Sequence, residues 1–235
     1  MKAVILAGGL GLRLRPFTEI IPKPLLPIGE KAVLEIQIEH LKVHGFNEVF
    51  LATNYRSDYI EKFLGNGLPY GVKLTISKEE KPLGTAGPLT LLKKELNEPF
   101  IVINGDILSS IDFSKFYRFA LEKDTMLTIA IKQMITPFAF GNIYFKNDFV
   151  TNIEEKPNFV AYVLAGIYAM KPDILTMIPD NEYYNMDVLI KSMLSKGIPI
   201  AKYEMTEYWL DIGAVEDFEE AEDAYNKHLK VHQSK

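Results

Sequence analysis

The chain has 235 residues, of which 48% are hydrophobic and 24% charged, a composition typical of a globular protein rather than a disordered one. It contains no cysteine, which excludes a disulfide framework, a thiol nucleophile and a cysteine-built metal site, and which predicts a cytoplasmic protein. The net charge of −5 argues against a nucleic-acid partner, and no apolar run is long enough to cross a membrane.

The N-terminal half alternates between strand and helix patterns. Apolar residues 3–7 run into Gly8-Gly9, which predicts a buried strand that ends in a turn. Further strands are predicted at 49–52, 72–76 and 100–103, and helices at 31–44, 60–64 and 89–96. This alternation is typical of βαβ units, so we expect an α/β protein with a Rossmann-like, doubly wound, mixed and mostly parallel sheet.

The C-terminal half is less regular. Strands are predicted at 126–131, 142–145, 150–153 and 162–170, with Asn147-Asp148 as a hairpin turn, and helices at 188–194 and 218–225. No internal repeat and no Gly/Ser linker divides the chain. We therefore expect residues 1–235 to form a single domain.

The most informative segment is the glycine-rich loop after the first strand. Ligands of open α/β sheets bind beyond the carboxyl ends of the strands, and glycines there let backbone N–H groups approach an anion. Leu14 stands where a dinucleotide fingerprint needs its third glycine, and no P-loop motif is present. The loop instead carries Arg13, Arg15 and Lys23, cations that suit a triphosphate.

Two aspartates are candidate metal ligands. Asp106 follows the strand at 100–103, and Asp211 lies more than a hundred residues further along. Two carboxylates together with phosphate oxygens are a common way to hold Mg²⁺, although either aspartate taken alone better suits a turn or a helix N-cap. Lys156 is a candidate site residue of a different kind, a cation rather than a metal ligand. It precedes a proline, which predicts an extended backbone at that lysine.

The run from Gly8 to Thr18, closed by Pro22-Lys23-Pro24, resembles the signature of the sugar-1-phosphate nucleotidylyltransferases. The resemblance continues through Gly84-Thr85-Ala86-Gly87, Asn104-Gly105-Asp106, Glu154-Glu155-Lys156-Pro157 and Trp209-Leu210-Asp211-Ile212-Gly213. It therefore covers nearly the whole chain. It implies a nucleotide-diphospho-sugar transferase fold and an enzyme that transfers a nucleotidyl group from a nucleoside triphosphate (NTP) to a sugar 1-phosphate, releasing pyrophosphate.

The resemblance also implies roles for individual residues. Arg13 would serve the transition state, Lys23 the triphosphate, and Asp106 with Asp211 the Mg²⁺ ion. The implied nucleotide contacts are Leu6, Gly8, Gly9, Gly11, Arg13, Lys23, Glu79 and Gly84. The implied contacts to the sugar phosphate are Gly141, Glu155, Lys156 and Gly166.

The segment Pro82–Leu89 is most similar to mannose-1-phosphate guanylyltransferases, and a carboxylate at Glu79 or Glu80 would accept hydrogen bonds from guanine. GTP and mannose 1-phosphate are thus the expected substrates. Guanylyl, uridylyl or cytidylyl transfer to a heptose, amino-sugar or glucose 1-phosphate stays open, as does an inactive regulatory subunit that binds a nucleotide sugar. The chain ends soon after its last predicted helix, so we expect no C-terminal β-helix domain, and a homo-oligomer is possible.

Overall fold

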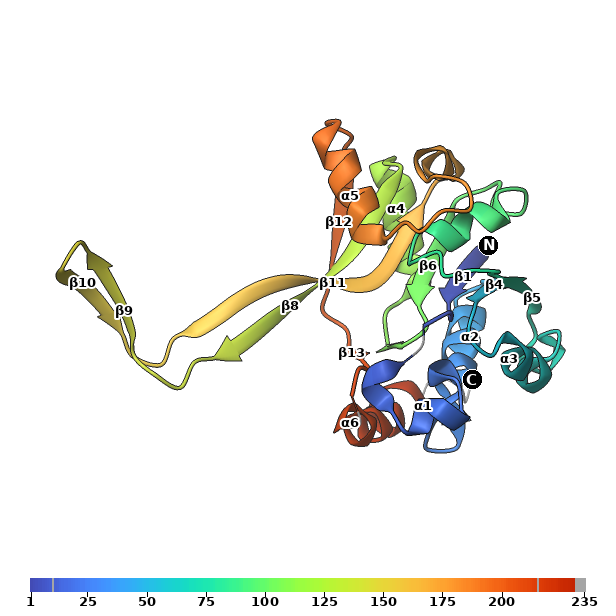
Figure 1. Cartoon of the computed structure of the whole chain (residues 1–235), viewed down its shortest axis with the longest axis horizontal. Helices are drawn as coiled ribbons and strands as arrows, with labels where there is room; N and C mark the ends of the chain where they lie inside the picture. Colours follow the sequence, from blue (N-terminus) through green and yellow to red (C-terminus); the bar gives the residue numbers. More distant parts are fainter. Residues whose placement is uncertain (10, 215, 231–235) are drawn as a thin grey trace.

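A seven-stranded mixed sheet forms the centre of the protein, and the computed structural model describes residues 1–9, 11–214 and 216–230 (Figure 1). Its strands are β1 (Lys2–Leu6), β4 (Glu48–Thr53), β5 (Lys73–Lys78), β6 (Phe100–Asn104), β8 (Leu127–Pro137), β11 (Asn158–Met170) and β12 (Ile200–Met205). They lie in the order β12-β8-β11-β6-β1-β4-β5. Only β11 runs antiparallel to its neighbours, so the predicted mixed, mostly parallel α/β sheet is confirmed.

Helical segments cover both faces of this sheet. One face packs against α2 (Val33–Val43), α3 (Ser57–Leu64) and α4 (Phe113–Lys123). The other packs against α5 (Met186–Ser195) and two 3-10 helices, η4 (Gly87–Leu92) and η5 (Pro172–Met177). Ala3 and Ile5 of β1 lie in the first core and Val4 in the second, because successive side chains of a strand point to opposite faces. The sheet is therefore doubly wound, as predicted.

A third, smaller core lies under the C-terminal helix α6 (Glu216–Ala224), which one π-helical turn extends through Tyr225–Leu229. Ile212 and Leu108 meet in this core. They belong to the segments around β13 (Trp209–Asp211) and β7 (Ile107–Ser109), which pair antiparallel. This core thus fixes a chain segment near residue 211 against the segment that follows β6.

The remaining short elements belong to the loops of the N-terminal half. They are the 3-10 helices η1 (Leu12–Leu14), η2 (Lys23–Leu25) and η3 (Leu68–Tyr70), the helix α1 (Phe17–Ile20) and the paired strands β2 (Pro27–Ile28) and β3 (Lys31–Ala32).

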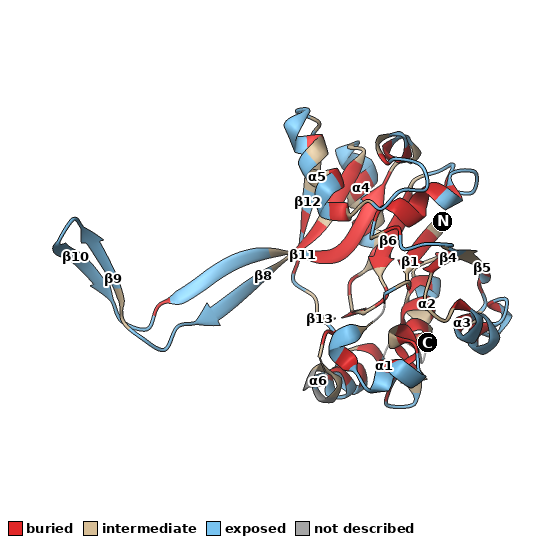
Figure 2. Cartoon of the chain, in the orientation of Figure 1, coloured by how far each residue is buried: buried red, intermediate tan, exposed pale blue. Residues whose placement is uncertain are grey.

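A long β-ribbon projects from the body (Figure 1). Pairing between β8 and β11 continues outward from Ile131–Leu164 to Pro137–Asn158. At its far end β9 (Asn142–Lys146) and β10 (Phe149–Glu154) form a hairpin, and the positive φ of Asn147 makes the predicted turn. We call residues 132–164 the arm; Figure 2 shows that nearly all of its outer part is exposed.

The structure differs from the sequence expectation in three elements. The helix predicted at 31–44 begins at Val33, because residues 31–32 pair as β3. The helix predicted at 89–96 is the 3-10 helix η4, whose N-terminal backbone N–H groups, from Ala86 and Gly87, donate to Tyr184 O at 2.9 Å each. Strands β8 and β11 are longer than predicted, because their outer residues pair with each other rather than with a buried sheet.

Candidate active site

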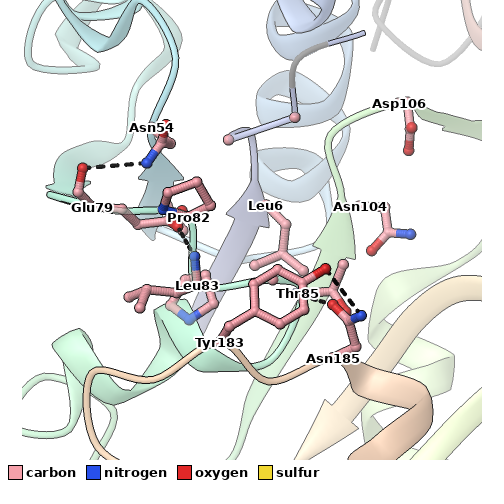
Figure 3. Close-up of a pocket in the computed structure, with 15 residues that line it drawn as sticks. Leu6, Asn54, Glu79, Pro82, Leu83, Thr85, Asn104, Asp106, Tyr183 and Asn185 are labelled. Carbon is pink, nitrogen blue, oxygen red and sulfur yellow. Dashed lines mark hydrogen bonds between the residues drawn. The ribbon is translucent and has the colours of Figure 1, made fainter. Parts of the chain in front are cut away.

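A cavity of about 350 Å³ opens at the carboxyl ends of the parallel strands. Leu6 ends β1, Asn104 ends β6, and Asn54 and Glu79 directly follow β4 and β5. The cavity therefore lies where open α/β sheets bind ligands. Six of the predicted residues line it: Leu6, Gly8, Gly9, Glu79, Gly84 and Asp106. In Figure 3, Glu79 and Asp106 lie at opposite sides of this pocket.

Glu79 is a half-buried carboxylate whose position is held from two sides. Its Oε2 accepts a hydrogen bond from the Leu83 N–H at 2.9 Å, and Asn54 Nδ2 donates to its backbone carbonyl at 3.4 Å (Figure 3). Burial raises the pKa of Glu79, and the Leu83 N–H partly offsets that shift. Its Oε1 faces Gly8, where a Cβ atom would lie only 2.8 Å away. Glu80, the other candidate base contact, is exposed and does not line the cavity.

The glycine loop packs closely at Gly11. Gly11 has a φ of +60°, and a Cβ atom there would lie 2.8 Å from Thr18 Cγ2 and 3.0 Å from Lys23 Cβ. Thr18 Oγ1 donates to the Gly11 carbonyl at 2.9 Å and closes the loop. Only glycine fits this conformation and this contact without strain. Gly11 therefore lets the loop pack directly against Lys23.

We expect Gly11→Ala to destabilise the protein by about 1–3 kcal/mol, because alanine would be strained at this φ and would press on Thr18 and Lys23. Urea unfolding would measure the loss. Gly9→Ala is the matched control, since a Cβ atom at Gly9 would meet no atom of the described residues within 4 Å. Equal stability of both variants would show that the loop rearranges at no cost.

The opposite end of the cavity gathers charges from distant parts of the chain. Lys23 Nζ donates to Asp106 Oδ2 at 2.5 Å. The pairing of β7 with β13 sets Ile107 opposite Asp211, and Ile212 N–H donates to the Asp106 carbonyl at 2.9 Å. The guanidinium of Arg13 lies against Gly213, where a Cβ atom would be 3.0 Å from both of its terminal nitrogens.

The pKa of Asp211 shows that these charged groups influence one another. Partial removal from water raises the pKa of Asp211, and the Asp106 carboxylate raises it further. Lys23 and Arg13 act in the opposite direction on the same carboxyl group. Arg13, Lys23, Asp106 and Asp211 thus share one electrostatic environment, although Arg15, on the same loop as Arg13, instead faces solvent near Glu19.

This carboxylate pair has the donor chemistry of a hard-cation site. Among the residues that the structure describes, no cluster of three or more His, Cys, Asp or Glu side chains could form an all-protein metal site. Two carboxylates that repel each other suit a cation such as Mg²⁺, which takes its remaining ligands from phosphate and water.

A second cavity of about 360 Å³ shares Thr85, Asn104 and Asn185 with the first. It is lined further by Gly166, one of the predicted sugar contacts, whose φ is +68°. Trp209 Nε1 donates to the Ala165 carbonyl at 2.8 Å and ties β13 to this segment. None of the described residues donates a hydrogen bond to the buried Asn104 Oδ1, so a ligand hydroxyl in this cavity could donate to it.

The other three predicted sugar contacts lie on the arm. Gly141 and Glu155 meet near the base of the hairpin, where a Cβ atom on Gly141 would be 3.0 Å from Glu155 Oε2. Lys156 is adjacent, ten residues from Gly166, and the extended ribbon between them spans about 25 Å. The structure therefore does not bring Gly141, Glu155 and Lys156 to the cavities of their own chain.

The backbone expectation for Lys156 is wrong. Its φ is +48°, in the left-handed region, rather than extended. The chain must turn between the end of β10 at Glu154 and the start of β11 at Asn158, and this turn overrides the preference set by Pro157.

Sequence reasoning missed the segment that forms the wall opposite the glycine loop. Tyr183 and Asn185 line the first cavity (Figure 3). Asn185 Oδ1 accepts from the Thr85 N–H at 3.3 Å, and Thr85 Oγ1 accepts from the Met186 N–H at 2.8 Å. The only signal for this segment is two tyrosines and an asparagine in a polar loop before a helix.

The fold and the position of the pocket define an α/β protein with a ligand site at the carboxyl ends of its parallel strands, and residues 2–228 match the protein family described as Nucleotidyl transferase. The chain belongs to this family. It is 35% identical over 227 residues to a probable mannose-1-phosphate guanylyltransferase 1 of Oryza sativa subsp. japonica, a match that covers 93% of this chain and 63% of that protein. The chain thus spans about three fifths of the length of such curated relatives.

Solved structures agree with the fold. A putative glucose-1-phosphate thymidylyltransferase from Bacillus anthracis, crystallised with a sucrose, superposes with a TM-score of 0.78 at 26% identity, covering 95% of this chain and 94% of that one. HddC from Yersinia pseudotuberculosis gives 0.76 at 30% identity, covering 95% and 99%, and has also been solved in complex with GMP-PN. Within the described residues, no helix has the length and apolar character that crossing a membrane requires.

Proposed function

We propose that this chain transfers a nucleotidyl group from an NTP to a sugar 1-phosphate. A phosphate oxygen of the sugar 1-phosphate attacks the α-phosphorus of the NTP, forming a new P–O bond, while the bond from that phosphorus to the bridging oxygen breaks and pyrophosphate leaves. The observation that carries the proposal is the pocket itself, which has the carboxylate of Glu79 at one side and, at the other, Asp106, to which Lys23 donates a hydrogen bond.

The reaction needs no protein nucleophile and no general base. A phosphate monoester has a second pKa near 6 and is largely dianionic at neutral pH. The difficulty is to bring two polyanions together while charge spreads over the reacting phosphate, and positioning with electrostatic stabilisation meets it. In our proposal Arg13 stabilises the transition state, Lys23 holds the triphosphate, and the N–H groups of Gly8, Gly9 and Gly11 cradle it.

Asp106 and Asp211 would hold Mg²⁺, which supplies positive charge to the phosphates when it is bound. Lys23 donates to Asp106 in the structure, so the same lysine can neutralise this carboxylate when no cation is there. The shared environment of both carboxylates supports their joint assignment.

Guanine is the base we propose. The half-buried Glu79 presents a carboxylate oxygen to the pocket, and a carboxylate can accept from both N1–H and the 2-amino group of guanine. The guanylyltransferase names of the curated relatives and the GMP-PN complex of HddC support this choice. Gly84, whose φ is +79°, lets the wall at Tyr184 and Asn185 pack against this edge of the pocket, since a Cβ atom there would lie 2.8 Å from the Tyr184 carbonyl oxygen.

The second cavity would take the sugar phosphate, with Gly166 beside the ring and the unpartnered Asn104 Oδ1 accepting from a hydroxyl. Mannose 1-phosphate is the proposed sugar, by similarity to the named relatives. We propose that residues 1–235 act as one nucleotidylyltransferase domain, since one sheet and its flanking cores unite both halves. The chain has no cysteine, which supports a cytoplasmic location.

The test is a matrix of nucleoside triphosphates against sugar 1-phosphates, with Mg²⁺, in which pyrophosphate release is measured. We expect the highest kcat/KM for GTP with mannose 1-phosphate. Release with another pair would correct the specificity, whereas no release from any pair, together with binding of a nucleotide sugar, would identify a regulatory subunit instead.

We expect Glu79→Gln to lower kcat/KM for GTP by about 10-fold or more, because the variant loses a charge-assisted acceptor and places an amide donor against guanine. ITP lacks the 2-amino group, so its use should change less. Glu80→Gln is the control, since Glu80 is exposed outside the pocket. Equal losses for GTP and ITP would argue that Glu79 only supports the loop at Leu83.

A further inference from the structure

The arm carries a concentration of exposed apolar side chains that its own chain does not cover. Of the twenty-eight exposed large hydrophobic residues in the described part of the chain, fourteen lie within residues 134–164. Phe140, Phe145 and Phe149 are each 70% exposed or more. Figure 2 shows the outer arm as pale blue ribbon projecting from a body whose strands are largely buried.

The ribbon is apolar on both of its faces. Val160 pairs with Ile135, and Tyr162 and Leu164 lie on the same side, two and four residues along the strand. Phe159 and Met134 point to the other side. An isolated two-stranded ribbon is marginally stable in water, and one with two apolar faces needs a cover.

The exposed area matches what a stable dimer requires. Seven of the fourteen side chains are aromatic: Phe138, Phe140, Tyr144, Phe145, Phe149, Phe159 and Tyr162. At roughly 200 Å² for a full aromatic side chain, and with about half of each exposed, they present on the order of 700 Å² before the aliphatic residues are added. A standard interface buries about 800 Å² on each partner, whereas the largest apolar patch of a monomer is typically about 300–600 Å².

The same arm carries the three predicted sugar contacts that lie outside both cavities. Gly141, Glu155 and Lys156 sit near the base of its hairpin, about 25 Å along the ribbon from Gly166. Seven consecutive paired positions of β8 and β11 separate them from the body, so the arm reaches its own pocket only by breaking this pairing or bending sharply. A pocket on another molecule imposes neither cost.

We propose that the arm docks on a second copy of this chain and that its Lys156 completes the sugar-phosphate cavity of that copy, an inference that rests on the function proposed above. The exchange is reciprocal about a two-fold axis, so each of the two sites combines the Arg13 loop of one chain with the arm of the other. Tyr183, which lines the first cavity and is 64% exposed, offers an apolar contact for the incoming arm.

Complementation between two defective variants tests the exchange. Lys156→Ala impairs the arm and Arg13→Ala impairs the loop, and each alone should have little activity at a sugar-phosphate concentration below the wild-type KM. The two chains are co-expressed with different affinity tags, and the heterodimer is isolated through both. One of its two sites would combine an intact loop with an intact arm, so we expect about half of the wild-type activity. Activity no higher than that of the single variants would overturn the proposal.

Sedimentation velocity provides a readout that does not depend on catalysis. We expect the wild-type chain to sediment as a dimer at micromolar concentration, and Phe145→Ser/Phe149→Ser to weaken the dimer by about 100-fold or more. Phe63→Ser, on α3, is the matched control because Phe63 is 52% exposed but lies outside the arm, and it should leave the dimer intact. A monomeric wild type, or a dimer that the arm variant does not weaken, would contradict the exchange.

Pyrophosphate release and sedimentation velocity test the proposed function and the proposed exchange of arms independently. If the wild type released no pyrophosphate from any substrate pair, the proposed function would fail while sedimentation still decided whether the arm joins two copies. An active monomer would instead support the function and show that the arm bends onto its own pocket.

Discussion

Arg13→Ala is expected to lower kcat by about 100-fold or more while changing the KM for the sugar phosphate much less. The guanidinium of Arg13 lies against Gly213 and lowers the pKa of Asp211, so it shares the electrostatic environment of the two aspartates. Charge that develops on the reacting phosphate would be stabilised there, and an alanine leaves that charge to water. Steady-state pyrophosphate release, with each substrate varied in turn, measures both constants.

Arg15→Ala is the matched control for this variant. Arg15 has the same charge and lies two residues away, but its side chain is 59% exposed and its Nε is 3.9 Å from Glu19. A surface ion pair of this kind contributes little, so we expect activity within about threefold of the wild type. Equal losses for the two arginines would indicate a general attraction of the loop for polyanions rather than a transition-state contact at Arg13.

Asp211→Asn is expected to lower Mg²⁺-dependent activity by about 100-fold or more and at the same time to raise the Tm of the metal-free protein. The folded state raises the pKa of Asp211 above its ordinary value of 3.8, so the ionised carboxylate destabilises the fold. This destabilisation is absent well below pH 3.8, grows as the pH rises from 3.8 through the raised pKa, and is complete above that pKa. Asparagine removes it.

Thermal unfolding with and without Mg²⁺ separates the two effects. The Tm of the wild type should rise when Mg²⁺ is added with nucleotide, and that of Asp211→Asn should rise less. Asp180→Asn is the control, because Asp180 is 75% exposed and pairs with Lys93 at the surface, away from the pocket. A variant at Asp211 that kept full activity and the full response to Mg²⁺ would remove this residue from the metal site.

Local patterns were sufficient for the parts of the protein in which the cause is also local. Apolar runs of four or five residues predicted the buried strands β1, β4 and β6 because both faces of a doubly wound sheet are covered. The glycine loop was predicted from the strand end before it, and Asn147 from hairpin turn chemistry. The extended backbone predicted at Lys156 was wrong, because the chain reversal between two strands outweighs the backbone preference that the following proline sets.

The sequence by itself thus determined the α/β class, the edge of the sheet at which the cavity lies and the residue types that gather there, since these follow from periodicity, glycine spacing and charge. Only the tertiary structure decided which distant segments meet: Tyr183 and Asn185 on the pocket wall, and Asp211 beside Asp106 through the pairing of β13 with β7. It also decided that Lys156 lies far from Gly166. The physical reason is that strand pairing and core packing between remote segments set these distances, and no local pattern of residues encodes them.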